Sequence, residues 1–300
     1  MPSIKDLRKR ISSVKNTQQT TKAMKMVSAA KLRRSQDAIQ NHRPYARRID
    51  SLIRRVSALS SGAIALSPLI RNDEVSPFDR RKKVLLVLVT SDRGLCGAFN
   101  SNIIKAAQKW LIANGPAYES VEMSFLGRRG YDFFKTKHVK IASYYQDLGG
   151  RVTFVKARKL TAKLIDDYLL GGIDEIKFVY NEFKNVMSQK VVIERFLPLE
   201  EEPIENVNTS EEKPVFLIKP SQQQLLDLLI EKNFAVQAFR IMLESQAGEH
   251  GARMASMENA TRNAGEMIKK LTLQYNKQRQ AGITKELLEI IGGTESQKAS

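Results

Sequence analysis

Cysteine, histidine and long hydrophobic runs are scarce in this sequence, and each shortage excludes a class of protein. The single cysteine, Cys96, cannot form a disulfide within the chain or a cysteine zinc site, which fits a reducing compartment. His42, His138 and His250 are scattered and lack the spacing of metal ligands. The longest purely aliphatic run is Val84–Val89, whereas a helix that crosses a bilayer needs about 20 apolar residues. No apolar signal region follows the first Met, so we expect no secretion by a signal peptide.

Positive charge is abundant and unevenly placed. The 300 residues are 42% hydrophobic and 27% charged, a composition typical of a soluble folded protein, and they carry a net charge of +17. Residues 1–58 hold 15 basic and 3 acidic residues, a net charge of +12, whereas residues 59–220 carry +4 and residues 221–300 carry +1. A concentrated positive segment predicts an anionic partner, which is a nucleic acid, a membrane surface or an acidic protein face.

The prolines divide the chain into two long ends and a middle. Residues 3–43 and 221–300 contain no proline, which predicts long helices at both ends of a compact domain. Ser3 and Asp6 are suited to cap the first helix, and apolar residues then follow at helical spacing. Residues 23–32 are rich in small or flexible side chains, which predicts a close approach of a second helix there. Pro44 either kinks this helix or splits it.

The C-terminal segment has the period of a coiled coil. Ser221 and Gln224 predict a capped helix start. Steps of 3 and 4 residues, averaging 3.5, then separate Met254, Met257, Thr261, Ala264, Ile268, Leu271 and Tyr275. The apolar pattern continues to Ile291, and we expect Gly292 and Gly293 to end the helix. An unbroken helix over 221–291 is about 105 Å long, so it is either broken or projects as a rod. Antiparallel pairing with the first helix would bury the apolar stripes of both.

Strands alternate with helices in the middle of the chain, which predicts a largely parallel sheet. The expected strands are 84–89, 121–126, 139–144, 175–180 and 190–197, and the expected helices are 102–113, 128–135 and 157–170. An acidic surface linker with two prolines is expected at 200–214.

The sequence contains no catalytic constellation. Residues 91–100 follow a strand and open a helix, where phosphate-binding loops occur, but they lack the Gly-Lys-Ser/Thr ending and the three-glycine dinucleotide spacing. We therefore interpret the glycines as residues of a tight turn. Cys96 has no histidine nearby in sequence and is expected to be a buried structural thiol. Glu244, Glu249 and His250 are expected to be solvated helix residues rather than metal ligands, because Gly248 and Gly251 would not make a rigid platform for ligands. No cofactor or metal site is predicted.

Three blocks of sequence carry a more specific signal. Residues 5–17 and 21–33 read KDLRKRISSVKNT and TKAMKMVSAAKLR, and residues 91–100 read SDRGLCGAFN. Residues 249–261, 271–284 and 289–293 read EHGARMASMENAT, LTLQYNKQRQAGIT and EIIGG. Together, in this order, they resemble the gamma subunit family of the F-type, proton-translocating ATP synthase, in its bacterial form, over essentially the whole chain.

The resemblance implies an α/β fold with long helices, in which the N- and C-terminal helices form an antiparallel coiled coil and a Rossmann-like α/β domain is inserted between them. The implied segments are 1–60 (first helix), 61–83 (linker), 84–199 (α/β foot domain), 200–220 (acidic linker) and 221–300 (last helix). It also implies a non-catalytic central-stalk rotor, present in one copy per complex. Such a rotor couples proton-driven rotation of the membrane ring to the catalytic cycle of the beta subunits, in ATP synthesis or hydrolysis.

The resemblance implies partners and a location as well. The partners are the alpha and beta subunits, the epsilon subunit and the membrane ring of c subunits, and nucleic acid is not among them. The expected location is peripheral, on the cytoplasmic face of a bacterial inner membrane. The chloroplast-type dithiol insertion of the family is absent, so no thiol switch within the chain is expected.

Site residues follow from the resemblance one position at a time. Contacts between rotor and stator are implied at Met24, Arg33, Arg34, Arg253, Gln280 and Thr284. An apolar tip that sits in a hydrophobic sleeve is implied at Leu287, Leu288, Ile290 and Ile291. The family loop supplies Asp92, Gly94, Cys96 and Gly97. Glu258 stands where many relatives carry lysine, and the tail 294–300 is more polar than is usual in the family.

Two other hypotheses remain at this point. A basic coiled-coil protein that binds nucleic acid would lose affinity steeply with salt, because binding releases counterions. An enzyme that uses the loop at 91–100 would bind nucleotide as an isolated chain.

Overall fold

A computed structural model describes residues 3–59, 69, 82–145, 152–185, 188–199 and 221–298. The chain forms two compact units. We call Met1–Ala29 with Arg253–Ser300 the coil unit, and Ala30–Ala252 the sheet unit. Apart from residues 69, 82 and 83, the predicted linkers 61–83 and 200–220 lie outside the described residues.

The sheet unit contains a five-stranded sheet of order β3-β2-β1-β4-β5. Its strands are β1 (Lys83–Val89), β2 (Ser120–Leu126), β3 (Lys140–Tyr145), β4 (Glu175–Phe183) and β5 (Gln189–Leu197). The first four strands in that order are parallel to their neighbours, and β5 is antiparallel to β4. The predicted, largely parallel sheet is therefore confirmed, with every strand close to its predicted position.

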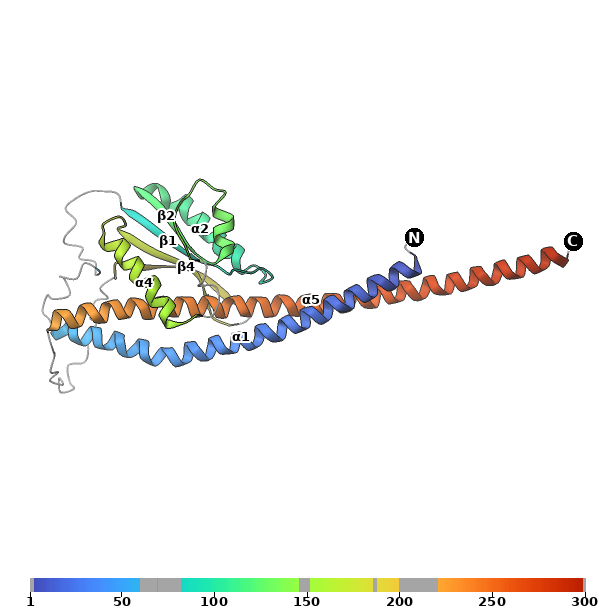
Figure 1. The fold of residues 1–300 in the computed structure, drawn as a ribbon, viewed down its shortest axis with the longest axis horizontal. Coiled ribbons are helices and arrows are strands. Elements are labelled where there is room, and N and C mark those ends of the chain that lie inside the picture. Colours follow the sequence, from blue (N-terminus) through green and yellow to red (C-terminus); the bar gives the residue numbers. More distant parts are fainter. Residues whose placement is uncertain are drawn as a thin grey trace. The chain divides into compact units, whose positions relative to one another are not determined.

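Helices cover both faces of this sheet (Figure 1). α2 (Phe99–Asn114) and α3 (Arg128–Phe134) contribute to one core, together with Leu86 and Leu88 of β1. α4 (Phe154–Leu169) and the last helix contribute to a second core, together with Leu85, Val87 and Val89. Because both faces are covered, β1 is apolar at every position from Val84 to Val89 rather than at alternate ones.

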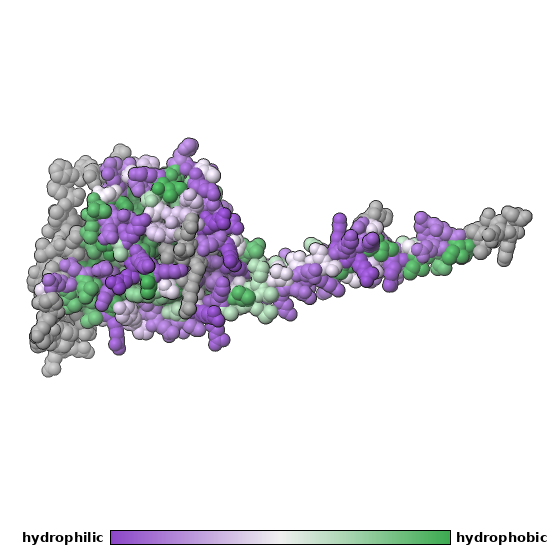
Figure 2. All heavy atoms as spheres, in the orientation of Figure 1, coloured by the Kyte–Doolittle hydropathy of each residue, from purple (hydrophilic) through white to green (hydrophobic). Residues whose placement is uncertain are grey.

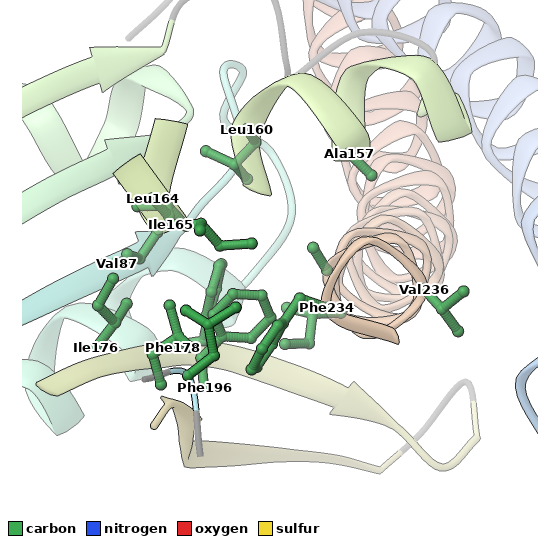
Figure 3. Packing of buried hydrophobic residues seen from close by; sticks show 14 of the residues in the cluster. Val87, Ala157, Leu160, Leu164, Ile165, Ile176, Phe178, Phe196, Phe234 and Val236 are labelled. Atoms are coloured by element: carbon green, nitrogen blue, oxygen red, sulfur yellow. The ribbon is translucent and has the colours of Figure 1, made fainter. Parts of the chain in front are cut away.

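The second core fixes the last helix against the sheet within the sheet unit. Figure 3 shows Phe234 of that helix pointing toward the side chains of the strands, and Phe234 and Val236 both belong to this core. The ring of Phe234 lies 5.2 Å from that of Phe196 on β5, which in turn lies 4.8 Å from Phe178 on β4. This row of aromatic rings leads from the helix into the sheet.

α1 (Ile4–Leu59) is one continuous helix with Pro44 inside it, so of the two predicted effects of Pro44 the split does not occur. Its predicted cap is confirmed. The Asp6 backbone N–H donates to Ser3 Oγ at 3.1 Å, and the Ser3 backbone N–H donates to Asp6 Oδ2 at 3.3 Å. This reciprocal pair is a capping box, and it explains why the helix begins where it does.

α5 (Gln222–Lys298) is also continuous, and Ser221 caps it by accepting a hydrogen bond from the Gln224 backbone N–H at 3.3 Å. The predicted stop at Gly292 and Gly293 is wrong, because the helix runs through both glycines. A glycine inside a helix costs about 1 kcal/mol relative to alanine but keeps its backbone hydrogen bond. Two glycines therefore weaken this end of the helix without ending it.

Candidate functional site: the helix pair and the loop after β1

In the coil unit, α5 presents the predicted coiled-coil stripe to α1. Met257 and Ala264 are buried, and Met254, Thr261, Ile268, Leu271 and Tyr275 are half-buried, while most residues between them are exposed. The steps of 3 and 4 residues along this stripe are those of a two-helix seam. The predicted antiparallel pairing of α1 and α5 is confirmed. Thr21 of α1 contacts Thr261 of α5, and Lys25, further along α1, contacts Glu258, which comes earlier in α5.

The expectation for residues 23–32 holds only in part, because Ser28 and Leu32 are buried but Ala23, Met26 and Val27 are exposed. In the coil unit the seam positions of α1 follow steps of 4 and 3, and they are Leu7, Ile11, Val14, Gln18, Thr21, Lys25 and Ser28, with Met24 and Ala29 half-buried beside them. Met26 and Val27 are 60% and 56% exposed, and Ala23 is exposed as well. The steps of 3 and 4 that continue from Leu7, Ile11 and Val14 fall on Gln18, Thr21, Lys25 and Ser28, so Ala23, Met26 and Val27 lie between seam positions.

Polar contacts join the two helices at this seam. The hydroxyl oxygens of Thr21 and Thr261 lie 2.8 Å apart, and Lys25 Nζ lies 2.6 Å from Glu258 Oε1. Gln18 Nε2 donates to the carbonyl oxygen of Thr261 at 3.4 Å. Polar partners inside a coiled coil fix its register, because any other register would leave them unpaired. Glu258, the departure from the family pattern, is thus engaged within the coil unit.

The residues implied as rotor–stator contacts fall into both units. Met24 is half-buried and Arg253 is buried, whereas Gln280 and Thr284 are exposed, and all four belong to the coil unit. The Thr284 hydroxyl donates to the carbonyl oxygen of Gln280 at 3.0 Å, so these two positions are linked within α5.

Arg33 and Arg34 are exposed on α1, in the sheet unit. They belong to a run of exposed basic side chains on α1 that also includes Lys31, Arg43, Arg47 and Arg48. Asp37 is the one acidic residue in the segment 30–49, all of which the structure describes. The predicted concentration of positive charge is therefore a solvent-facing feature of this helix.

The apolar tip on α5 is exposed. Its four side chains, Leu287, Leu288, Ile290 and Ile291, are 54% to 64% exposed. A Cβ added at Gly282 would lie 3.6 Å from the side chain of Ile4, so Gly282 lies beside the residue at which α1 begins. Later residues of α5 therefore lie beyond the described start of α1, and Figure 2 shows hydrophobic atoms toward this end of the helix.

The family loop is closed by hydrogen bonds among its own residues. The Ser91 backbone N–H donates to Asn100 Oδ1 at 2.9 Å, and Asn100 Nδ2 donates to Ser91 Oγ at 2.8 Å. Asp92 Oδ1 accepts from the Arg128 backbone N–H at 3.0 Å. Cys96 is 2% exposed, as predicted for a structural thiol. These bonds tie the loop to the start of α2 and to the start of α3.

Backbone conformation explains part of the glycine pattern in this loop. Gly97 has φ of +56°, which confirms a turn that favours glycine, and Leu95 has φ of +64°, which the sequence did not indicate. Gly94 lies against the guanidinium of Arg129, where an added Cβ would stand 2.9 Å from Nη2. The loop therefore packs against the start of α3 and leaves little room for a side chain at Gly94.

A buried ionic network in the sheet unit was missed by the sequence analysis. Glu175 accepts hydrogen bonds from Tyr118, at 2.8 Å, and from Arg195, and lies 3.3 Å from Lys177 Nζ. Burial favours the neutral form of Glu175, but the Tyr118 hydrogen bond and the charges of Lys177 and Arg195 outweigh it and hold its pKa below the usual value. These partners are far apart in sequence, so no local pattern could reveal them.

A second network joins α5 to the sheet through Arg240. Its Nη1 donates to the Tyr180 hydroxyl at 3.1 Å and its Nη2 to Glu194 Oε1 at 2.6 Å. Glu244 lies one helical turn further along α5, 3.6 Å from Nη1 of Arg240. Burial raises the pKa of Glu244. The charge of Arg240 acts to lower this pKa, whereas the charges of Glu182 and Glu194 act to raise it.

Within the part of the chain that the structure describes, no three His, Cys, Asp or Glu side chains lie close enough to hold a metal ion. None of the described helices has a stretch long and apolar enough to cross a membrane.

Comparison with known proteins identifies the family. Residues 3–296 match the family described as ATP synthase. The chain is 46% identical over 299 residues to the ATP synthase gamma chain of Geotalea uraniireducens, covering 99% of this chain and 100% of that one. It is 45% identical over 302 residues to the ATP synthase gamma chain of Bdellovibrio bacteriovorus, with the same coverage.

Solved structures share the fold. A chain of the Euglena gracilis mitochondrial ATP synthase, in its OSCP/F1/c-ring structure, aligns with a TM-score of 0.65 at 20% identity, covering 99% of this chain and 95% of that one. A chain of the Tetrahymena thermophila mitochondrial ATP synthase central stalk and c-ring aligns with a TM-score of 0.58 at 24% identity, covering 80% and 99%. The chain therefore belongs to the family of ATP synthase gamma chains, the non-catalytic central-stalk subunits of the F-type enzyme.

Proposed function

We propose that this chain is the rotor that couples proton-driven rotation of a membrane ring to the catalytic cycle of the beta subunits. The observation that carries the proposal is full-length similarity to bacterial gamma chains, together with a coil unit whose register is fixed by internal polar contacts. Proposed partners are the alpha and beta subunits, the epsilon subunit and the ring, with one copy of this chain in each complex. The proposed location is the cytoplasmic face of a bacterial inner membrane.

The paired helices suit the transmission of torque. Helices held by Thr21–Thr261 and Lys25–Glu258 resist sliding past each other, because sliding would unpair these groups. The helix pair also has chemically different sides, since Met26 and Val27 are exposed on α1 next to basic residues. As such a shaft turns, each beta subunit meets a different surface, and its conformational populations shift with the free energy of those contacts.

We assign the rotor–stator contacts of this proposal to Met24, Arg33, Arg34, Arg253, Gln280 and Thr284. Exposure of Arg33, Arg34, Gln280 and Thr284 supports direct contact, whereas the burial of Arg253 supports an indirect role through the helix pair. The exposed apolar tip is proposed to turn in a hydrophobic sleeve. If the tip supplies only a smooth bearing, alanine at Leu287 and Ile291 should leave most of the ATPase activity.

Reconstitution tests the proposal. ATPase activity is measured for this chain alone, for alpha plus beta, and for all three mixed, and the mixture is passed over a gel-filtration column. We expect no activity from the chain alone and an active complex that survives gel filtration and moderate salt. Nucleotide hydrolysis by the isolated chain, or an alpha–beta mixture that never incorporates it, would show the proposal to be wrong.

A further inference from the structure

The contact between α5 and the sheet contains one directional cluster among apolar side chains. Phe234, Val236, Ile241 and Met242 of α5 are buried in the core on this side of the sheet. Such contacts contribute free energy in proportion to buried area but are not directional. Arg240 differs, because its guanidinium reaches hydrogen-bond acceptors on two strands of the sheet.

Arg240 holds β4 and β5 at once. It donates to the hydroxyl of Tyr180 on β4 and to Oε1 of Glu194 on β5, and Tyr180 donates to Oε2 of the same carboxylate at 2.7 Å. The three side chains thus form a closed triangle of hydrogen bonds. Gln237 Oε1 accepts from Nε of Arg240 at 2.8 Å, which orients the guanidinium from its own helix. Each of these bonds depends on the angle of α5 about its axis.

Burial makes this triangle stiff. Tyr180 is fully buried, and Arg240 and Glu194 are only partly exposed. Charge-assisted bonds of a planar guanidinium are short and directional, and a lysine cannot reproduce their fork. Eight residues beyond Arg240, Gly248 lets α5 approach the sheet closely, since an added Cβ would lie 3.3 Å from the Phe99 ring and 3.7 Å from Asn181. The helix is therefore held close to the sheet and also fixed in rotation.

We propose that Arg240 is a positioning residue for energy coupling, which fixes the angle of α5 relative to the α/β domain so that torque passes between them. This proposal rests on the proposed rotor function. Torque applied at the domain reaches α5 as a force on side-chain contacts, and the triangle resists the rotation that apolar contacts alone allow. Loss of the triangle would let the helix yield before the catalytic sites respond, so ATP hydrolysis and proton transport would become less tightly linked.

The test compares two activities of the assembled enzyme. ATP hydrolysis and ATP-driven proton pumping are both measured for the complete synthase in the same inverted membrane vesicles. The readout is protons pumped per ATP hydrolysed, because a smaller amount of assembled synthase lowers both activities together. The variants are Arg240→Met, which keeps the side-chain length, and Glu194→Gln, which changes a partner without touching the helix. Arg240→Lys tests partial rescue.

Asp132→Asn provides a matched control. Asp132 forms exposed ion pairs with Arg128 and Lys135 on α3, so the change removes a carboxylate of the same domain away from α5. We expect Arg240→Met and Glu194→Gln to lower pumping per ATP by about threefold or more, a modest value for coupled neighbouring residues. Arg240→Lys should fall between Arg240→Met and the wild type, and Asp132→Asn should match the wild type.

The outcomes separate this inference from the proposed function. If Arg240→Met fails to assemble, Glu194→Gln decides, because it keeps the shape of the side chain. Unchanged pumping per ATP in Glu194→Gln, or an equal loss in Asp132→Asn, overturns the role of Arg240 while leaving the rotor function intact. A wild-type chain that neither assembles with alpha and beta nor supports pumping overturns both.

Discussion

Gly127→Ala should destabilise the sheet unit strongly, because Gly127 lies where the ends of β1 and β2 meet. Its backbone has φ of 97° and ψ of 147°, a region that side chains other than glycine occupy at a cost of about 1–3 kcal/mol. An added Cβ would lie 2.0 Å from the carbonyl oxygen of Thr90, a backbone atom that cannot rotate away. The substitution therefore combines a conformational cost with a collision.

The collision also threatens two hydrogen bonds. The Thr90 backbone N–H donates to the Leu126 carbonyl at 2.8 Å, and the Gly130 backbone N–H donates to Thr90 Oγ1 at 2.9 Å. Weakening each costs about 0.5–1.5 kcal/mol. Together with the backbone conformation, we expect a loss of about 2–6 kcal/mol in the free energy of unfolding.

Urea unfolding of the full chain measures this loss through the fluorescence of Trp110, the single tryptophan, which lies on α2 in the sheet unit. Two glycines serve as controls. Gly171 has φ of +73° but open space around it, and Gly115 has helical φ and open space. We expect Gly127→Ala to lose most, Gly171→Ala about 1 kcal/mol and Gly115→Ala almost nothing. A Gly127→Ala variant no less stable than Gly171→Ala would show that the collision with Thr90 does not cost stability.

Three further predictions concern buried charge and the helix seam. Glu244→Gln should raise the urea midpoint at pH 7, because burial raises the pKa of Glu244 above its ordinary value of 4.5. The wild type therefore loses stability as the pH rises above 4.5, whereas the variant lacks this loss. Equal pH profiles of stability for the two proteins would contradict this prediction. Glu175→Gln should lower stability at pH 7 by about 1–3 kcal/mol. The pKa of Glu175 is held below its usual value, so its contribution is lost as pH falls, and the difference between variant and wild type should shrink at acid pH. Thr21→Cys with Thr261→Cys should form a disulfide on mild oxidation, because the two hydroxyl oxygens lie 2.8 Å apart, and a non-reducing gel would detect it. Met26→Cys with Thr261→Cys is the control that should stay reduced, since Met26 is exposed.

Much of the fold follows from local periodicity. The run 84–89 predicted the central strand because a strand covered on both faces is apolar throughout, and β1 occupies 83–89. The steps of 3 and 4 residues from Met254 to Tyr275 predicted the seam of α5, and those residues are buried or half-buried. Where one periodic pattern decides a structure, the sequence alone is sufficient.

The errors arose where small or polar residues carry the structure. Ala23, Met26 and Val27 suggested a close helix contact, but the register set by Leu7 and Ile11 turns them toward solvent. The stop predicted at Gly292 and Gly293 overstated the cost of glycine, which weakens a helix without breaking its hydrogen bonds.

Long-range pairs could not be predicted at all. Arg240 lies 46 residues from Glu194 and 60 from Tyr180 in sequence, and the two strands come together only through the sheet register. One feature of the sequence could have indicated that Arg240 has a partner. Arg240 stands among apolar residues of α5, and a charge in a buried helical stretch requires a partner. The identity of that partner depends on tertiary structure.

Rotation of this chain within a complex with alpha and beta subunits is the most direct test of the proposed rotor function. Cys96 is buried, so a Lys109→Cys variant offers one exposed thiol on α2, to which a visible probe can be attached in an immobilised complex with alpha and beta. If this chain is the rotor, the probe turns in one direction when ATP is supplied and stops when ATP is withdrawn. Sustained ATP hydrolysis by a labelled complex whose probe does not turn would contradict it.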